Sequence, residues 1–251
     1  MKFIGIIPAR YGSSRFPGKP LAMIGEYPVI QWVYLRCEKS GLDRVVVATD
    51  DARIEKIVRD FGGEVSMTSP EHVSGTDRCG EAAALLGLSD EDVIVNIQGD
   101  EPFIRSEDID LLIRLFEDKD VKIATLYTPF RDKSLVDNPN QVKVIFTLEK
   151  RALCFSRYGL PYVREPGNRA DFDYYKHIGI YAFKYKTLRE LISLPESELE
   201  KAEKLEQMRW MENGYIIHLA ESNYEGIGID TPEDLRNANR LILSFQNPEK
   251  N

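Results

Sequence analysis

The sequence has few of the residues that build disulfide frameworks or metal clusters. Its 251 residues include three histidines and three cysteines, Cys37, Cys79 and Cys154. An odd number of widely spaced cysteines suits reduced thiols better than disulfides, so we expect a cytoplasmic protein. Neither a CxxC nor an HExxH spacing occurs. The sequence therefore gives no indication of a zinc site.

Long apolar runs and an excess of positive charge are also missing. No run of about 18 apolar residues occurs, and the apolar part of Met1–Arg10 is too short for a secretory signal, so we expect no membrane span. The chain has 33 lysines and arginines against 41 aspartates and glutamates, a formal net charge of −8. This balance argues against broad binding to nucleic acids or anionic membranes. It still allows an anionic small substrate, which needs only a local cluster of positive charge.

The first half of the chain alternates strand and helix patterns. With 43% hydrophobic and 29% charged residues, the chain has the balance of a globular protein with a buried core. We predict strands at 3–8, 45–48, 64–67 and 93–97, and helices at 29–40, 52–61 and 75–86. This alternation indicates βαβ units, and the continuous apolar strands indicate a parallel sheet covered on both faces.

The second half is less regular. We predict paired strands at 142–148 and 152–156, a loop at 160–175, a strand at 178–183, and helices at 186–193 and 204–213. Thr231-Pro-Glu-Asp is a good start for a last helix, with a hydroxyl at the N-cap, proline in the first turn and an acid three residues on. Without repeats or a clear linker, we expect residues 1–251 to form a single domain. Within it, a smaller, mixed, β-rich subdomain spans about residues 138–215.

A glycine-containing basic loop, residues 8–19, directly follows the first predicted strand. Gly12 and Gly18 permit backbone conformations that other residues avoid, and backbone N–H groups in such a loop can point at phosphate oxygens. Three basic residues lie within ten positions: Arg10, Arg15 and Lys19. Ligands of open α/β sheets bind at the carboxyl ends of strands, where this loop falls. We therefore predict a phosphate-binding loop, with a solvated surface loop as the alternative; its spacing matches neither GxxxxGK[ST] nor GxGxxG.

The series of motifs along the chain resembles the CMP-Kdo synthetase family, the 3-deoxy-manno-octulosonate cytidylyltransferases. It begins with IPARYGSSRFPGKPL at residues 7–21 and covers nearly the whole chain in order. The other segments are ATDD (48–51), SGTDR (74–78), NIQGDEP (96–102), NPNQVK (138–143), FSR (155–157), HIGIY (177–181), LEQMR (205–209) and GIDTPEDL (228–235). The resemblance implies a doubly wound, Rossmann-like nucleotidyltransferase fold with a mostly parallel sheet. It also implies a homodimer, Mg²⁺, CTP as donor and Kdo as acceptor.

Two aspartates are candidate metal ligands. Asp100 lies just past the strand predicted at 93–97, and Asp230 precedes the last helix. Carboxylates suit Mg²⁺, which usually takes one or two of them plus phosphate oxygens. Asp100 could instead be a turn residue and Asp230 a helix cap, although Thr231 is better placed for capping. By resemblance, Asp100 and Asp230 are the metal ligands and, with Lys19, the catalytic residues.

The resemblance also implies which residues bind the nucleotide. They lie in three segments: Pro8, Ala9, Arg10, Ser13, Arg15 and Lys19; Ser74, Gly75 and Arg78; Gln98 and Gly99. Ser74 is equally well placed to cap the following helix, and Gly75 allows a close approach.

The predicted sugar-acid site lies within about residues 138–215, the segment that would also form the dimer. The residues implied for it are Arg157, His177, Tyr181, Glu206 and Gln207. Arg157 can bind a carboxylate through two parallel hydrogen bonds, and His177 and Tyr181 would share one side of a strand. A lone histidine is more often structural, as we interpret His72 and His218 to be. A Glu-Gln pair can also be a solvated helix face.

We predict direct in-line attack by the anomeric hydroxyl of Kdo on the α-phosphorus, because the reaction requires no covalent enzyme intermediate. No general base stands out in the sequence, which agrees with activation of the hydroxyl by a metal. The nearest alternative acceptors are 8-amino-Kdo and sialic acid, for which the loop and both aspartates would look the same. A non-catalytic nucleotide-binding regulator would be expected to lose a metal carboxylate or Lys19, and the sequence keeps all three.

Overall fold

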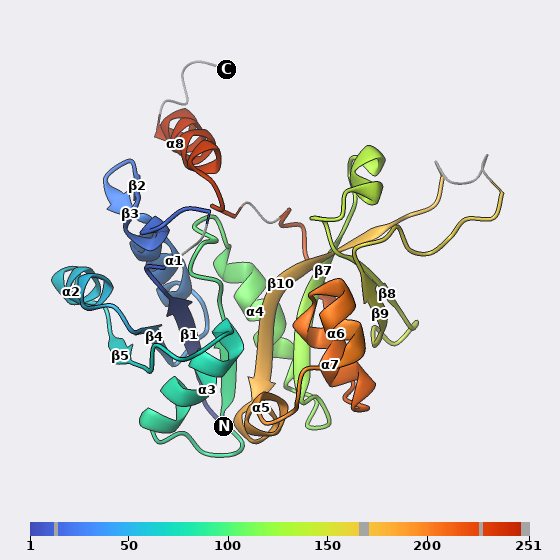
Figure 1. Cartoon of the computed structure of the whole chain (residues 1–251), viewed down its shortest axis with the longest axis horizontal. Helices are drawn as coiled ribbons and strands as arrows, with labels where there is room; N and C mark the ends of the chain where they lie inside the picture. Colours follow the sequence, from blue (N-terminus) through green and yellow to red (C-terminus); the bar gives the residue numbers. More distant parts are fainter. Residues whose placement is uncertain (13–14, 166–170, 226–227, 247–251) are drawn as a thin grey trace. The chain divides into compact units, whose positions relative to one another are not determined.

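The computed structural model describes residues 1–12, 15–165, 171–225 and 228–246 (Figure 1). The chain forms two compact units, which are described separately. Unit 1 comprises Met1–Asp110 and Gly226–Asn251, and unit 2 comprises Leu111–Glu225. The subdomain expected at about residues 138–215 lies inside unit 2, which begins earlier. Among the described residues, no helix has the length and apolar character needed to cross a bilayer.

A four-stranded parallel sheet forms the centre of unit 1. The strands pair in the order β6 (Val93–Asn96), β1 (Phe3–Ala9), β4 (Arg44–Thr49) and β5 (Val65–Met67). β6 is buried throughout and β4 is buried after its first residue. Both strands consist largely of valine and isoleucine, which suit a sheet shielded from solvent on both faces. The predicted α/β architecture is confirmed here.

Helices connect these strands, and the order of the connections indicates where a ligand can bind. They are α1 (Val29–Glu38), α2 (Ala52–Asp60) and α3 (Gly75–Leu85); α4 (Ser106–Leu115) follows β6, and the division between the two units falls within it, after Asp110. The chain adds β4 and β5 on one side of β1 and then crosses back to add β6 on the other. Right-handed crossovers therefore place α1 and α2 on one face of the sheet and α3 on the opposite face. The strand order reverses between β1 and β6, and ligands bind at the carboxyl ends of strands at such a point.

The last helix packs against the N-terminal segment of unit 1. That segment comprises the 3-10 helix η1 (Lys19–Leu21) and the short paired strands β2 (Met23–Ile24) and β3 (Tyr27–Pro28), and the last helix is α8 (Pro232–Gln246). Ala238 and Ile242 of α8 share a buried apolar cluster with Ile24, Val29 and Ile229. The cluster therefore holds the start of α8 beside the N-terminal loop.

The start of α8 is as predicted. Thr231 Oγ1 accepts a hydrogen bond from Asp234 N at 3.2 Å, and Asp234 Oδ2 accepts one from Thr231 N at 2.8 Å. This reciprocal pair is a capping box, which satisfies two backbone donors at the end of the helix.

Unit 2 is built on a mixed, mostly antiparallel sheet. Its strands are β7 (Ile123–Pro129), β8 (Lys143–Phe146), β9 (Ala152–Ser156), β10 (Tyr175–Lys184) and β11 (His218–Glu221). β11 pairs with β7 in parallel, while the pairs β7–β10, β10–β8 and β8–β9 are antiparallel. An antiparallel bridge between Arg151 and His218 joins the two ends of this series. The predicted pairing of the strands at 142–148 and 152–156 is confirmed.

The helices of unit 2 correct one expectation. They are η2 (Lys133–Asp137), α5 (Tyr185–Ile192), α6 (Glu198–Glu203) and α7 (Glu206–Glu212). The helix predicted at 204–213 is wrong at its start, because Lys204 has a left-handed backbone, φ 51°, and ends α6. Glu206 is the first residue of α7. The short segments on either side of Lys204 are therefore separate helices.

Candidate functional site

One cavity of about 280 Å³ lies at the carboxyl ends of β1 and β6 in unit 1. Every described residue predicted to bind the nucleotide or the metal lines it: Pro8, Ala9, Arg10, Arg15, Lys19, Ser74, Gly75, Arg78, Gln98, Gly99, Asp100 and Asp230. Ser13 lies outside the described residues. Pro20, His72 and Val73 also line the cavity and were missed. The fold thus gathers segments more than 200 positions apart around the switch point of the sheet.

The basic loop is closed and anchored by its backbone and one aromatic ring. Gly18 N donates to Tyr11 O at 2.8 Å, and Gly18 has φ 75°, a left-handed conformation that glycine permits. Gly12 does not use this freedom, because its φ lies outside the left-handed region. The Arg53 guanidinium lies 3.3 Å from the centre of the Tyr11 ring and is held by two hydrogen bonds to Asp51. The loop is thereby attached to the start of α2.

Lys19 lies between the two predicted metal ligands. Its Nζ is 2.5 Å from Asp100 Oδ2 and 3.1 Å from Asp230 Oδ1. Burial alone would lower the pKa of Lys19, but the nearby carboxylates of Asp100 and Asp230 raise it above its ordinary value. Arg15 also contacts Asp230, with NH2 3.3 Å from Oδ2. Two carboxylates and two cationic groups therefore meet at the cavity.

A backbone hydrogen bond keeps the two aspartates together. Ile229 N donates to Asp100 O at 2.8 Å, and the Ile229 side chain is fully buried. Asp230 follows immediately, so its position is tied to that of Asp100. Since Thr231 caps α8, Asp230 is not needed for that role, although its N–H donates to Asp234.

The pair of carboxylates fits a divalent cation that binds together with a nucleotide. Among the described residues, no group of three His, Cys, Asp or Glu side chains is placed to hold a metal ion. A site for Zn²⁺ or Ca²⁺ made by protein groups alone is therefore not indicated in this part of the chain. Mg²⁺ usually takes only one or two carboxylates and completes its shell with phosphate oxygens and water. Asp100 and Asp230 provide that number.

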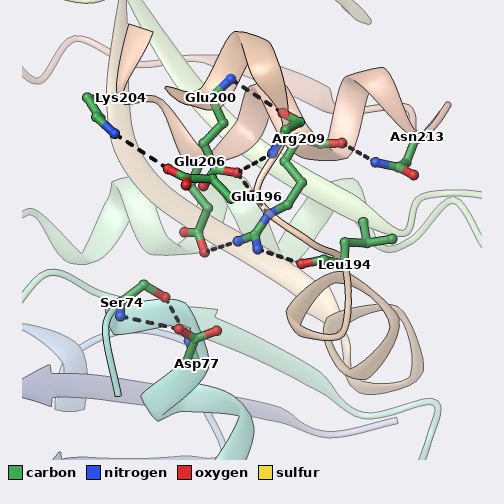
Figure 2. A network of polar contacts seen from close by, with 10 residues as sticks. Ser74, Asp77, Leu194, Glu196, Glu200, Lys204, Glu206, Arg209 and Asn213 are labelled. Atoms are coloured by element: carbon green, nitrogen blue, oxygen red, sulfur yellow. Dashed lines mark hydrogen bonds and ion pairs between the residues drawn. The ribbon is translucent and has the colours of Figure 1, made fainter. Parts of the chain in front are cut away.

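The start of α3 forms another wall of the cavity. Ser74 Oγ accepts a hydrogen bond from Asp77 N at 3.0 Å, and Ser74 N donates to Asp77 Oδ2 at 3.3 Å (Figure 2). The capping role considered for Ser74 is thus confirmed, and its part in binding a base stays a prediction. Arg78 is 3% exposed, donates to Thr68 Oγ1 at 2.6 Å and lies 3.5 Å from Asp50 Oδ1. Its guanidinium is held in a fixed orientation beside the cavity.

His72 combines a structural contact with a place at the cavity. Its Nε2 contacts Glu81 Oε2, which also accepts a hydrogen bond from Ser69 N at 2.8 Å. Burial alone would raise the pKa of Glu81, but these hydrogen bonds lower it, so Glu81 is charged at neutral pH. The structural interpretation of His72 is therefore supported, and its position at the cavity had no signal in the sequence.

The close approach of two strand ends requires glycine at position 99. Replacing Gly99 tests whether this approach shapes the nucleotide cavity. A Cβ at Gly99 would lie 2.8 Å from Pro8 O, a backbone atom that cannot move without moving the loop. We expect Gly99→Ala to raise the KM for CTP about ten-fold and to lower Tm, as overpacking does at a cost of about 1–3 kcal/mol. Gly12→Ala is the matched control, because a Cβ there meets no atom of the described residues within 4 Å. Equal kinetics for both variants would contradict this account of the loop.

His177 and Tyr181 share one face of β10, as predicted. They pair with Tyr127 and Thr125 of β7, two positions apart, across a bulge in β10. Their rings are 5.3 Å apart, and His177 Nε2 lies 3.0 Å from Thr125 Oγ1. The Thr125 hydroxyl also lies 2.7 Å from Ile180 O, to which it can donate, and His177 Nε2 can then donate to the hydroxyl oxygen. This arrangement gives His177 a structural role, and contact with a sugar stays a prediction.

The burial of His177 predicts a pH dependence of stability. Burial, and secondarily the charge of Lys176, lowers the pKa of His177 from 6.5 to about 3. Below about pH 6.5 the unfolded chain binds a proton that the folded chain does not, so stability falls as pH falls toward 3. Between pH 7 and 5, urea titrations should show wild type losing about 2 kcal/mol more than His177→Gln. Identical pH slopes would mean that His177 takes up a proton in the folded chain about as readily as in the unfolded chain.

Arg157 is held by backbone carbonyls. Its Nε donates to Glu203 O at 2.6 Å, NH1 to Pro139 O at 2.9 Å and NH2 to Lys204 O at 3.3 Å. The buried Lys143 in turn donates to Arg157 O. Three of the five guanidinium N–H donors are thus in use, so a two-bond grip on a carboxylate would require Arg157 to release some of them. Its role in the sugar-acid site stays a prediction.

The start of α7 is not a solvated helix face. Gln207 is 5% exposed, and its Nε2 has no hydrogen-bond partner among the residues that the structure describes. Glu206 is half-buried, with Oε1 3.0 Å from Arg209 NH2 (Figure 2). Tyr181 is buried, and burial, followed by the charge of Glu206, raises its pKa well above 10. The structure therefore places His177 beside Tyr181, and it packs α7, the helix of Glu206 and Gln207, against Tyr181 through Trp210, with 5.0 Å between the ring centres.

Comparisons with known proteins agree over nearly the whole chain. The profile of the family described as "Cytidylyltransferase" matches residues 4–222. A 3-deoxy-manno-octulosonate cytidylyltransferase of Parabacteroides distasonis is 52% identical over 247 residues, which are 95% of this chain and 97% of the relative. An 8-amino-3,8-dideoxy-manno-octulosonate cytidylyltransferase of Shewanella frigidimarina is 47% identical over 239 residues, covering 94% and 96% of the two chains.

A solved structure is similar as well. It is described as CMP:2-keto-3-deoxy-manno-octonic acid synthetase complexed with CTP, and it has a TM-score of 0.91 and 41% sequence identity. The match covers 98% of this chain and 100% of the other.

Proposed function

The chain belongs to the cytidylyltransferase family, and within it to the 3-deoxy-manno-octulosonate cytidylyltransferases, and from this we propose that it transfers CMP from CTP to the anomeric hydroxyl of Kdo. The products are CMP-Kdo and pyrophosphate, and the reaction serves lipopolysaccharide biosynthesis. One structural observation gives the proposal its main support. A lysine and two aspartates meet in a cavity at the switch point of the sheet, lined by every described residue predicted to bind the nucleotide.

The chemistry follows from the charges at the cavity. The acceptor oxygen forms a bond to the α-phosphorus, the bond from that phosphorus to the pyrophosphate oxygen breaks, and the hydroxyl proton passes to water. Negative charge grows on the phosphate oxygens and on the leaving pyrophosphate, and fixed cations stabilise it. Lys19, Arg15 and Arg10 line the cavity and supply these cations. The reaction needs no covalent bond to the enzyme.

Asp100 and Asp230 are the residues that would hold Mg²⁺. When bound, the ion supplies positive charge at the phosphate oxygens and lowers the pKa of a coordinated hydroxyl. Before the nucleotide arrives, Lys19 and Arg15 neutralise these two carboxylates. Lys19 would then turn toward the triphosphate, which the length and flexibility of a lysine side chain allow.

Residues of unit 2 would select the sugar acid. We assign this role to Arg157, His177, Tyr181, Glu206 and Gln207. The buried amide of Gln207 supports the assignment, because an unpartnered buried donor is costly and a sugar hydroxyl would satisfy it. Glu206 offers a carboxylate acceptor on α7, the helix whose Trp210 ring lies 5.0 Å from the Tyr181 ring.

We also propose that the chain is a cytoplasmic homodimer. All three cysteines are free thiols, which suits a reducing compartment. Unit 2 exposes several large apolar side chains, which a second copy could cover: Leu148, Leu153, Tyr158 and Tyr162. Sedimentation velocity tests the assembly: a dimer is expected, and a monomer at micromolar concentration would contradict it.

A pyrophosphate-release assay tests the function. CTP and Mg²⁺ are supplied with Kdo, 8-amino-Kdo or sialic acid in parallel, and the account predicts the highest kcat/KM with Kdo. The amino sugar is the second candidate, because a relative with that activity in its name is 47% identical. Preference for 8-amino-Kdo would correct the acceptor alone. If pyrophosphate were released with none of the three sugar acids, the proposal would be overturned. A non-catalytic nucleotide-binding regulator would then be the better interpretation.

A further inference from the structure

We propose that Arg209 is a positioning residue for the sugar-acid site, holding the Glu206 carboxylate in the orientation in which it meets the acceptor. The inference rests on the function proposed above. Arg209 lies on α7, three residues after Glu206, and its side chain is only 11% exposed. No role for Arg209 follows from the sequence motif alone, because an arginine on a short helix is commonly a solvated surface group.

The guanidinium makes three contacts that point in different directions. NH2 lies 3.0 Å from Glu206 Oε1, Nε lies 3.2 Å from Glu200 Oε2 of α6, and NH1 donates to Leu194 O at 2.8 Å (Figure 2). A guanidinium is planar, so fixing two of its edges fixes the third. The hydrogen bond from NH1 to Leu194 O, together with the ion pair with Glu200, in which Nε makes no hydrogen bond to the described residues, holds the group where NH2 meets Glu206.

The start of α7 is packed into unit 2, with Leu205, Gln207 and Met208 buried, but it has no side-chain cap. The chain reverses at Lys204, where φ is 51°, and Leu205 at the N-cap provides no side-chain hydrogen bond. Neighbouring α6, by contrast, begins with a capping box formed by Ser197 and Glu200. Glu200 thus belongs to a helix start that the capping box fixes. Its ion pair with Arg209 helps to fix the position of Arg209 and, through it, of the Glu206 carboxylate.

The helix that carries Glu206 and Arg209 packs against another residue predicted to bind the sugar. The ring centres of Trp210 on α7 and Tyr181 on β10 are 5.0 Å apart, and the charge of Glu206 contributes to the raised pKa of that phenol. A rotation of Glu206 away from Tyr181 would remove a hydrogen-bond acceptor from the sugar-acid site and leave the nucleotide cavity of unit 1 unchanged. Loss of Arg209 should therefore weaken Kdo binding selectively.

A double-mutant cycle tests this role. The variants are Arg209→Met, Glu206→Gln and the two combined, and KM is measured separately for Kdo and for CTP. We expect Arg209→Met to raise the KM for Kdo about ten-fold and the KM for CTP less than about two-fold, in line with coupling energies between contacting residues. In the Glu206→Gln background, Arg209→Met should change the KM for Kdo by no more than about two-fold.

Two further variants keep the test independent of folding. Arg209→Lys retains the charge but loses the planar fork. Compared with Arg209→Met, it should therefore bring Tm closer to the wild-type value than it brings the KM for Kdo. Glu200→Gln weakens one contact of Arg209, while glutamine can still cap α6. It should raise the KM for Kdo by less than Arg209→Met does, about three-fold, and leave the KM for CTP within about two-fold of wild type.

The outcomes separate this inference from the proposed function. In one outcome, the wild type turns over Kdo while the effects of Arg209→Met and Glu206→Gln on the KM for Kdo are additive. This result would overturn the role of Arg209 and leave the proposed function intact. Equal increases in the KM for Kdo and for CTP would overturn it as well, because they would indicate general loss of structure. Absence of Kdo turnover by the wild type would contradict the proposed function and, with it, this inference.

Discussion

Replacing Asp100 by asparagine is expected to lower kcat by about 10²–10³-fold, the range seen when one electrostatic contact to a transition state is removed. Asparagine keeps the volume of the side chain and loses its negative charge. The variant would lose the ligand proposed for Mg²⁺ and the 2.5 Å contact with Lys19. The cavity lining would otherwise stay in place, because the bond from Ile229 N is to the backbone oxygen of residue 100. Pyrophosphate release at saturating CTP and Kdo measures the effect.

The matched control for this change is Asp60→Asn. Asp60 is an exposed carboxylate of unit 1 whose Oδ2 lies 2.5 Å from Lys56 Nζ on the surface of α2. Surface ion pairs contribute about 0–1 kcal/mol, so this variant should keep wild-type kcat and nearly the same Tm. Near-normal turnover of Asp100→Asn with Mg²⁺ would contradict the metal assignment.

Replacing Lys19 by methionine is the second change with a large expected effect. Methionine keeps the apolar stem and removes the charge, so Asp100 and Asp230 would face each other without the cation between them. Both the affinity for CTP and the stabilisation of the leaving pyrophosphate should fall. We expect kcat/KM for CTP to drop about 100-fold, with most of the loss in kcat.

The control for Lys19→Met is Lys56→Met, which removes an exposed lysine of the same unit. It should leave kcat/KM unchanged. Titration of each variant with CTP followed by tryptophan fluorescence separates binding from chemistry. If Lys19→Met kept its kcat and lost only affinity, Lys19 would be a binding residue without a part in the chemical step.

Local sequence patterns were sufficient to predict most of unit 1. β1, β4 and β6 are buried apolar runs, and the intervening helices have one apolar face, so each element could be recognised without its partners. α4 was missed although Ile109, Leu112 and Phe116 follow a helical spacing of three and four residues and are all buried. β7 was missed as well, although it is a buried run rich in β-branched residues. In both cases the signal was present in the sequence.

The break between α6 and α7 could not be predicted in the same way. Lysine rarely adopts a left-handed backbone, so nothing local indicates that the chain would turn at Lys204. The turn depends on tertiary contacts, among them the carbonyls of residues 203 and 204 that Arg157 binds. Such contacts join residues 46 or 47 positions apart and have no periodic signature.

The nucleotide cavity was predicted better than the sugar-acid site for a physical reason. Its residues follow strand ends, and the topology of a parallel sheet brings strand ends together whatever the side chains are. Asp230 is the exception, because it is positioned by the packing of α8 and the bond from Ile229 to Asp100. The sugar-acid residues depend instead on a bulge in β10, a left-handed lysine and a network around Arg209.

The most direct test of the central claim, cytidylyl transfer from CTP to Kdo, is ³¹P NMR of the wild-type reaction. CTP, Kdo and Mg²⁺ are incubated with the chain, and the fate of the α-phosphorus is followed. The account predicts that the α-phosphorus signal of CTP is replaced by a single phosphodiester signal of CMP-Kdo, with pyrophosphate in equal amount. Formation of CDP with inorganic phosphate, or an unchanged CTP spectrum with every sugar acid offered, would contradict it.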